Sequence, residues 1–210
     1  MPRFVGRENV RKRLAPLKGE PGRTTYADGA VRIEAAGEVI TVRPPFGLPH
    51  AGDYEVVRLE PLFEALAADH VVAALLVRLG GYAVGVFEGE RLVASKVGSR
   101  FVKGRHKKGG SSSGRFRRRR DEQARALIEE AAEVAAGVLE PWRDRVEFAA
   151  LGGDRKAIDD VLKSPQLAWL REKALPRFFD VPDPRQRVLE RLPYELYAVE
   201  LTEEAAPRQT

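Results

Sequence analysis

Residues Lys103–Gln123, KGRHKKGGSSSGRFRRRRDEQ, place cations on both sides of a short run of glycine and serine. Each cation can neutralise one phosphate and release a counterion. The glycine and serine residues leave backbone N–H groups free to lie against a phosphate or an oxyanion. An arginine after this run adds a planar fork of donors that matches phosphate or carbonyl oxygens. We therefore predict a polyanion-facing site whose catalytic candidates are Gly109, Gly110, Ser112, Ser113 and Arg115.

The cationic candidates form two clusters around that run. The second cluster lies at the expected N-terminus of a long helix, where the helix dipole favours anions. Cations there oppose the dipole, so a phosphate backbone passing nearby explains them better than helix stability does. We predict that both clusters bind RNA: Lys103, Arg105, His106, Lys107 and Lys108 in the first, and Arg117, Arg118, Arg119 and Arg120 in the second.

The net charge of +5 conceals a strong segregation of charge along the chain. Residues 91–120 hold 12 Lys/Arg and no Asp/Glu, whereas the other 180 residues carry 24 Lys/Arg against 31 Asp/Glu. A single basic segment on an otherwise acidic chain indicates one polyanion-facing site, not a surface that binds polyanions non-specifically. The alternative is a solvated loop in which glycine and serine only link two elements.

Composition limits the other chemistries. The 210 residues include no cysteine, which excludes thiol catalysis and fits a reducing cytoplasm. The three histidines, His50, His70 and His106, are too scattered for an evident metal site, so we expect no metal and no cofactor. The N-terminus lacks the apolar region of a signal peptide, and no apolar run approaches the roughly 18 residues of a membrane span. We expect a cytoplasmic protein with no membrane partner.

The hydrophobic pattern predicts the elements around the basic segment. Val71–Leu79 is a nearly continuous apolar run, typical of a strand buried on both faces. Further strands at Tyr82–Phe87 and Arg91–Val97 would complete a three-stranded antiparallel meander. Residues 98–116 lack apolar periodicity and are predicted to form a mobile loop. Arg117–Glu140 repeats apolar residues at helical spacing and predicts a long helix.

A strand–helix pattern follows Pro141. Gly152, Gly153 and Asp154 form the expected turn between the next strand and helix, with Asp154 as N-cap. The two glycines are RNA-binding candidates because a helix N-terminus can hold a phosphate; the alternative is an ordinary capped turn. The expected elements are strands at Val146–Leu151, Phe178–Val181 and Leu196–Leu201, helices at Arg155–Lys163 and Gln186–Leu192, and a frayed tail at residues 202–210.

Residues 1–66 read as a small N-terminal α+β unit, and residues 67–201 as a second, α/β domain. The N-terminal unit should contain a short helix within Val5–Leu17, a hairpin of Ala30–Glu34 with Val39–Arg43, and a helix at Leu59–Ala68. The second domain has the element order of a ribonuclease-H-like mixed sheet. A two-metal nuclease of that fold needs several converging carboxylates, and the first strand carries none.

The segment Val71–Leu201 resembles the Vms/ANKZF-like release factor (VLRF) family, most closely its actinobacterial branch of peptidyl-tRNA hydrolases. The resemblance rests on the strand order, the KGRHKKGG loop, the GRFRRRRDEQ helix start and the LGGD turn. The family is related in fold to the catalytic domain of eukaryotic and archaeal class-one release factors. The resemblance implies that the loop enters the large ribosomal subunit and frees nascent peptide from a stalled peptidyl-tRNA. The implied partners are the large subunit, its ribosomal RNA and peptidyl-tRNA.

Carried over by position, the family's diglycine corresponds to Gly109 and Gly110, its serine to Ser112, and its arginine to Arg115. The family pattern has one or two glutamines between this serine and this arginine, the counterpart of the glutamine in the GGQ motif of release factors. Here the two intervening residues are serine and glycine, so water positioning by a glutamine side chain is not implied. The alternatives are cleavage of the tRNA strand near its 3′ end and a non-catalytic RNA- or ribosome-binding protein, which the missing glutamine favours.

Overall fold

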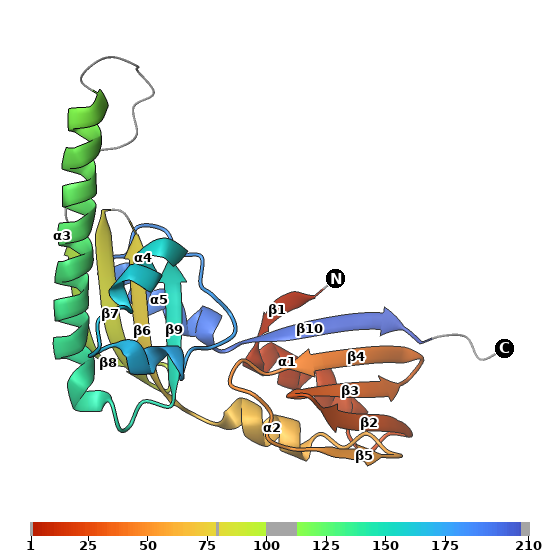
Figure 1. Cartoon of the computed structure of the whole chain (residues 1–210). Coiled ribbons are helices and arrows are strands. Elements are labelled where there is room, and N and C mark those ends of the chain that lie inside the picture. The colour runs from red at the N-terminus through yellow and green to blue at the C-terminus, as the bar shows by residue number, and fades with distance from the viewer. Residues whose placement is uncertain (1, 79, 100–112, 207–210) are drawn as a thin grey trace. The chain divides into compact units, whose positions relative to one another are not determined.

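The computed structural model describes residues 2–78, 80–99 and 113–206. The chain forms two compact units, one of residues Met1–Ala68 with Tyr194–Thr210 and one of Asp69–Pro193 (Figure 1). The N-terminal unit contains a six-stranded antiparallel sheet of order β1-β10-β4-β3-β2-β5. Its strands are β1 (Arg3–Gly6), β2 (Gly22–Ala27), β3 (Ala30–Ala35), β4 (Glu38–Arg43), β5 (Gly52–Tyr54) and β10 (Ala198–Ala205).

Tight turns set the register of this sheet. The turn between β3 and β4 has positive φ at both central residues, Ala36 and Gly37, and the turn between β2 and β3 has the same at Asp28 and Gly29. Positive φ at both positions is the type I′ geometry that matches the twist of a two-residue hairpin. The predicted β3–β4 hairpin is confirmed. The helices α1 (Arg7–Leu14) and α2 (Glu60–Ala67) are also close to their predicted positions, and the 3-10 turn η1 (Ala15–Leu17) follows α1.

The last strand differs from its predicted place. β10 pairs with β1 and β4 in the N-terminal unit, and residues 202–205, expected to fray, are part of it. Val199 and Leu201 are buried in the core that β3, β4, α1 and α2 form. Alternating apolar residues predicted a strand, but the pattern of one strand does not show which of two sheets it joins. The three short strands β1, β2 and β5 were not predicted.

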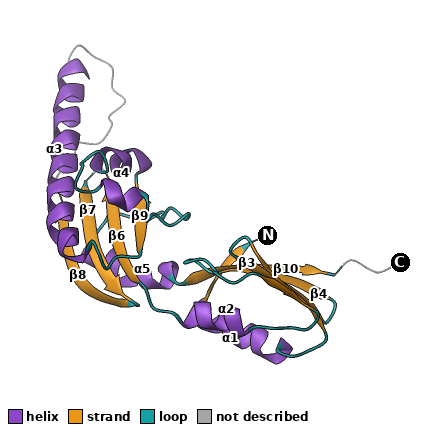
Figure 2. Ribbon diagram, turned by 60° about the horizontal axis from the view of Figure 1, so that its bottom comes forward, coloured by secondary structure: helices purple, strands orange, loops and turns teal. Residues whose placement is uncertain are grey.

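The second unit contains a mixed sheet of order β8-β7-β6-β9. Strands β6 (Val71–Arg78), β7 (Gly81–Glu88) and β8 (Arg91–Ser99) form the predicted antiparallel meander, and β9 (Phe148–Gly153) runs parallel to β6. Helices α3 (Ser113–Leu139) and α4 (Arg155–Val161) cover one face (Figure 2). The turns η2 (Glu140–Trp142) and η3 (Ala168–Arg171) follow, and α5 (Gln186–Leu196) contains the boundary between the two units.

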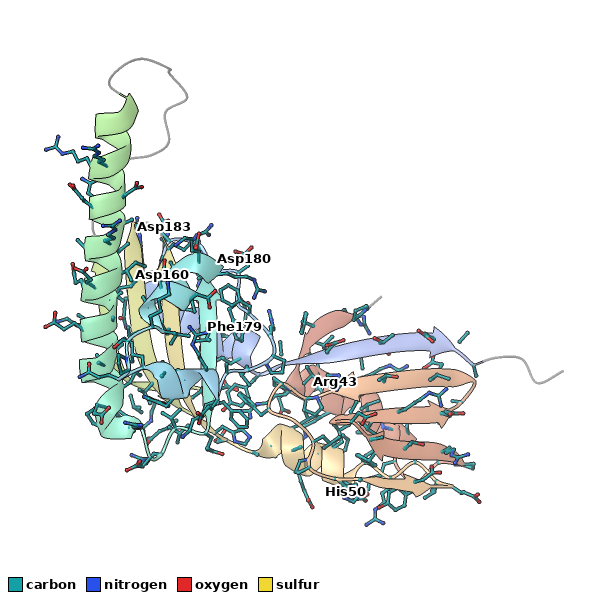
Figure 3. All side chains as sticks on the ribbon, in the orientation of Figure 1. Arg43, His50, Asp160, Phe179, Asp180 and Asp183 are labelled. Carbon is teal, nitrogen blue, oxygen red and sulfur yellow. The ribbon has the colours of Figure 1, made fainter. Side chains whose placement is uncertain are left out.

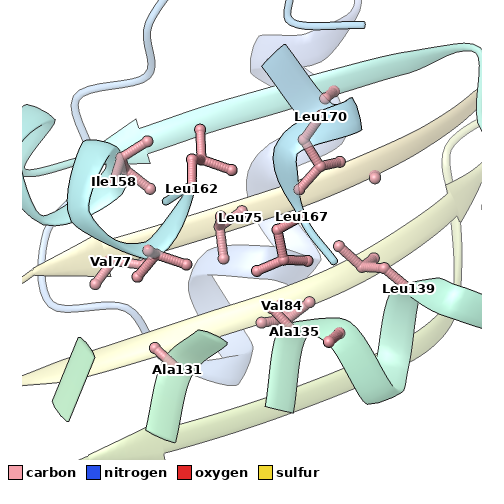
Figure 4. Close-up of a cluster of buried hydrophobic side chains, with 14 of the residues drawn as sticks. Leu75, Val77, Val84, Ala131, Ala135, Leu139, Ile158, Leu162, Leu167 and Leu170 are labelled. Carbon is pink, nitrogen blue, oxygen red and sulfur yellow. The ribbon is translucent and has the colours of Figure 1, made fainter. Parts of the chain in front are cut away.

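Strand β6 is buried on both faces, as predicted. Leu75 and Val77 face Ala131 and Ala135 of α3 in one core (Figure 4). The alternate residues Val72, Ala74 and Leu76 are also fully buried but point to the opposite face. On that face the side chain of Leu189, from α5, lies against Gly85 of β7.

The predicted mixed α/β class with its meander is confirmed. The fifth strand expected at Phe178–Val181 is reduced to isolated parallel bridges, one joining Gly152 to Phe179 and one joining Ala149 to Ala174. The ribonuclease-H-like assignment therefore stays a prediction. Among the described residues, no helix is long and apolar enough to cross a membrane.

Candidate nucleic-acid interface

Strand β8, which precedes the basic loop, ends at one edge of the second sheet. Arg78 at the end of β6 pairs with Gly81 at the start of β7, and Gly81 pairs with Ser99 at the end of β8. Val77 lies opposite Gly153, the last residue of β9. Because β6 and β9 are parallel, their carboxyl ends meet at this edge, where α/β sheets commonly bind ligands.

The loop itself begins after Ser99, and α3 follows it from Ser113. Most of the mobile loop that we predict at residues 98–116 therefore lies outside the part of the chain that the structure describes. The same holds for eight predicted site residues: Lys103, Arg105, His106, Lys107, Lys108, Gly109, Gly110 and Ser112.

Helix α3 begins four residues earlier than predicted. The expectation that Ser113–Phe116 belong to the loop is wrong, because their backbone forms the first turn of the helix. Ser113 and Arg115 are therefore helical residues. Apolar periodicity locates a helix only where one face is buried. The first buried side chain described in α3 is Leu127, so the pattern could not show where the helix starts.

The N-terminal half of α3 extends beyond the sheet (Figure 1). Arg118 and Arg119 are exposed, and no described side chain of α3 before Leu127 is buried. The first turn contains no acidic residue. At 1.5 Å per residue, residues 113–126 make a basic stem about 20 Å long. Arg117 and Arg120 belong to the same helical segment, which has the charge needed to follow a phosphate backbone.

A partly buried hydrogen bond helps to hold α3 against the sheet just beyond this stem. The hydroxyl of Tyr82, on β7, donates to Oε1 of Glu130 on α3 at 3.0 Å. The pKa of Tyr82 is raised, first because burial disfavours its charged form and then because the Glu130 carboxylate accepts its proton in that hydrogen bond. Tyr82 is 3% exposed. The pair therefore fixes α3 at the point from which its basic half projects.

The Gly152–Gly153 turn is shaped by close backbone packing. A Cβ at Gly152 would lie 2.6 Å from the carbonyl oxygen of Phe179, and Gly153 has φ +100°. Asp154 is the predicted N-cap of α4, since its Oδ1 accepts from the N–H of Ala157 at 2.9 Å. Packing accounts for both glycines without a ligand. Their contact with RNA stays a prediction.

Sequence reasoning missed a cleft at the same edge. It has a volume of about 580 Å³ and carries three arginines and two aspartates; Asp183 is labelled in Figure 3. The arginines come from segments about 100 residues apart, so no local motif joins them. The only sequence indication is the PDPRQR segment, residues 182–187, which leads into α5. The lining residues are Arg78, Asp154, Pro182, Asp183, Arg185 and Arg187.

The described residues of the two units contain no cluster of metal ligands. Among the described residues, no group of three or more His, Asp or Glu side chains lies close enough to hold a metal ion. The described surface of the edge thus offers arginine guanidinium groups, which suit binding of an anion.

Comparison with known proteins gives the chain its family. A family model described as "Actinobacteria/chloroflexi VLRF1 release factor" matches residues 70–202, more than half of the chain. Over 184 residues the chain is 25% identical to "Peptide chain release factor subunit 1" of Archaeoglobus fulgidus, covering 85% of this chain and 45% of that protein. The chain thus spans less than half the length of this curated relative.

Two solved structures are similar with TM-scores below 0.5. The crystal structure of the archaeal translation termination factor aRF1 has a TM-score of 0.44 and 15% identity, covering 76% of this chain and 49% of that one. The Vms1 mitochondrial localization core has a TM-score of 0.48 and 12% identity, covering 96% of this chain and 82% of that one. On the match of the family model, this chain belongs to the VLRF1 release factor family of Actinobacteria and Chloroflexi.

Proposed function

We propose that this protein is a cytoplasmic, ribosome-associated peptidyl-tRNA hydrolase that frees nascent peptide from stalled large subunits. The observation that carries the proposal is the segregated charge: 12 cations and no acid in residues 91–120. This segment spans β8, which ends at the sheet edge with Ser99, and the exposed basic stem of α3. Membership of a release factor family supports the same function.

The basic stem would position the protein on RNA. Arg118 and Arg119 are exposed near the N-terminus of α3, where they can contact phosphates of ribosomal RNA or tRNA. The loop that precedes the stem would then reach the 3′ end of the peptidyl-tRNA. Placement of reacting groups can supply a large part of a rate acceleration, so few catalytic side chains are required.

The reaction is hydrolysis of an ester. Water attacks the carbonyl carbon that joins the peptide to the tRNA, and a tetrahedral oxyanion forms. The ester bond then breaks, the 3′ oxygen of the tRNA leaves, and it takes up the proton that the attacking water has lost. In the proposal, backbone N–H groups at Gly109 and Gly110 stabilise the oxyanion. Arg115, on the first turn of α3, contributes a fixed positive charge beside them.

The test is single-turnover release of peptide from large subunits that carry peptidyl-tRNA. Gly110→Val adds a β-branched side chain where the loop must approach the tRNA end, and we expect it to abolish release. Arg115→Lys keeps the charge but loses the planar fork, so release should fall almost as far as in Arg115→Ala. Arg191→Ala, which removes an exposed cation from α5, is the control. Full release by both Gly110→Val and Arg115→Ala would refute the proposed role of the loop.

A non-catalytic RNA-binding protein is the second candidate, and the serine and glycine in place of the family glutamine favour it. Mapping the tRNA 3′ ends in the same experiment separates the possibilities. Released peptide with an intact tRNA indicates ester hydrolysis. A shortened tRNA indicates cleavage of the strand, and stable binding with neither product indicates the non-catalytic function.

A further inference from the structure

The cleft at the sheet edge has the composition of an anion site. Five of its six lining residues are charged, and three of these are arginines. Its volume of about 580 Å³ lies in the range of pockets for small ligands. A lining with this many charged groups disfavours an apolar ligand, because such a ligand would leave those groups without water or partners.

Arg78 is held in position before any ligand arrives. Its Nη1 donates to the carbonyl oxygen of Val181 at 2.6 Å. The aliphatic part of its side chain packs over Gly153, where an added Cβ would lie 3.1 Å from Arg78 Cγ. The guanidinium has five N–H donors, so this bond leaves others for an anion. A side chain fixed in this way loses little conformational entropy when it binds.

The other two arginines are not committed to strong partners. The Nη2 of Arg185 lies 4.0 Å from Oδ2 of Asp183, and both side chains are largely exposed. Among the described residues, Arg187 forms no ion pair within 4.0 Å. An anion can therefore replace Asp183 as the partner of Arg185. The second acid, Asp154, already accepts a hydrogen bond as the cap of α4.

The cleft lies beside the start of the basic loop. A Cβ at Gly81 would lie 3.6 Å from the carbonyl oxygen of Pro184 and 3.8 Å from the Cα of Ser99. Ser95 of β8 also donates through its hydroxyl to Oε1 of Gln186 at 3.3 Å. Pro184 and Gln186 thus lie beside β7 and β8. An RNA strand bound at the end of β8 would therefore lie near the cleft.

We propose that this cleft binds a backbone phosphate of the RNA strand that the basic segment engages. Arg78 is the fixed anchor, and Arg185 and Arg187 close on the same phosphate or on the next one. Arginine suits this role because its planar fork matches phosphate oxygens. That the strand is the acceptor end of tRNA rests on the proposed function; the recognition of a phosphodiester rests on the cleft.

The test measures binding of the full chain to a fluorescent RNA hairpin with a single-stranded 3′ end, over a series of salt concentrations. We expect the double variant Arg185→Ala/Arg187→Ala to weaken binding about tenfold, as loss of charge-assisted hydrogen bonds predicts. The salt slope should fall by about one, the value for one phosphate contact. Asp183→Asn should strengthen binding about twofold, because it removes a weak competing ion pair.

Arg191→Ala is the control, since it removes one exposed arginine from α5 one turn beyond Arg187. A double variant that binds RNA as this control does would overturn the proposal. Binding of inorganic phosphate that depends on Arg187, with RNA binding unchanged, would overturn the assignment to an RNA strand. Arginine-dependent RNA binding without peptide release would refute only the proposed hydrolysis. Release that is independent of these arginines, with unchanged RNA binding, would refute only the cleft.

Discussion

The carbonyl oxygen of Val77 occupies the place where a side chain at Gly153 would begin. The same oxygen accepts from the N–H of Asp154 at 2.7 Å, so it cannot move without breaking a bond at the start of α4. Gly153 also has φ +100°, a backbone conformation that residues with a Cβ rarely adopt. Residue type at position 153 is thus dictated by the parallel pairing of β6 and β9.

Gly153→Ala is therefore expected to destabilise the protein by about 2 kcal/mol or more, through backbone strain and a displaced strand end. Gly137→Ala is the control. Gly137 is exposed on α3 with nothing within 4 Å of a built Cβ. Alanine there should stabilise by about 0.5–1 kcal/mol, because glycine costs conformational entropy in a helix. Denaturant unfolding of both variants checks the pair, and similar free energies of unfolding would contradict the account.

Glu147 immediately precedes β9, at the other end of the second sheet, and we expect it to make the stability of the fold depend on pH. Burial by itself would raise the pKa of Glu147, but hydrogen bonds from His70 and from the N–H of Val71 outweigh it and lower the pKa from its usual 4.5. The distances are 2.9 Å to His70 Nδ1 and 3.0 Å to the Val71 nitrogen. A carboxylate with a lowered folded pKa stabilises the fold above its unfolded pKa. That contribution disappears as pH falls through the folded pKa.

We therefore expect the free energy of unfolding to fall less steeply below about pH 4.5 in Glu147→Gln than in the unaltered protein. Denaturant titrations at a series of pH values measure this slope. Glu172→Gln, at an exposed position of the same unit, removes a carboxyl group elsewhere and serves as the comparison. Parallel pH profiles for Glu147→Gln and the unaltered protein would show that the pair adds no pH-dependent stability.

Local patterns predicted the local parts of the fold. The apolar run at Val71, the two short strands predicted after it and the helical spacing within Arg117–Glu140 each depend on neighbouring residues, and the structure has the meander and the long helix there. Pairing between segments far apart in sequence is not indicated by local sequence patterns. β10 joins β1 and β4 across more than 150 residues, and the segment at Phe179 reaches β9 through single bridges that need no strand pattern.

The candidate site divides in the same way. The basic segment was evident because its charges are contiguous in sequence, and Asp154 was found as a cap because the turn is local. The cleft could not be predicted from the sequence, because Arg78 and Arg187 come to line one cleft only after β6 and α5 have packed. The start of α3 was misplaced because no described side chain in its first turns is buried and could set a periodicity.

The basic stem of α3 predicts a salt-dependent interaction with RNA. Arg118→Ala/Arg119→Ala should lower the slope of log affinity against log salt by about one to two, as expected if each side chain neutralises a phosphate. Arg143→Ala/Arg145→Ala removes the same charge just beyond the other end of α3 and should leave the slope unchanged. Salt titrations of ribosome binding provide the measurement. Equal slopes in the two variants would place the RNA contact elsewhere.

The last prediction concerns the missing glutamine. Ser113 is the first residue of α3, and Gly114 follows it in the helix, at the positions that the resemblance assigns to the family's glutamine. A glutamine at position 113 would carry an amide that can orient water at the end of the loop. If backbone N–H groups and Arg115 already provide catalysis, Ser113→Gln should keep single-turnover peptide release at its rate or raise it. Gln123 lies ten residues further along the helix, about 15 Å away, so Gln123→Ala should leave release unchanged. A large loss of release in Ser113→Gln with normal ribosome binding would show that the small side chain at position 113 is itself required.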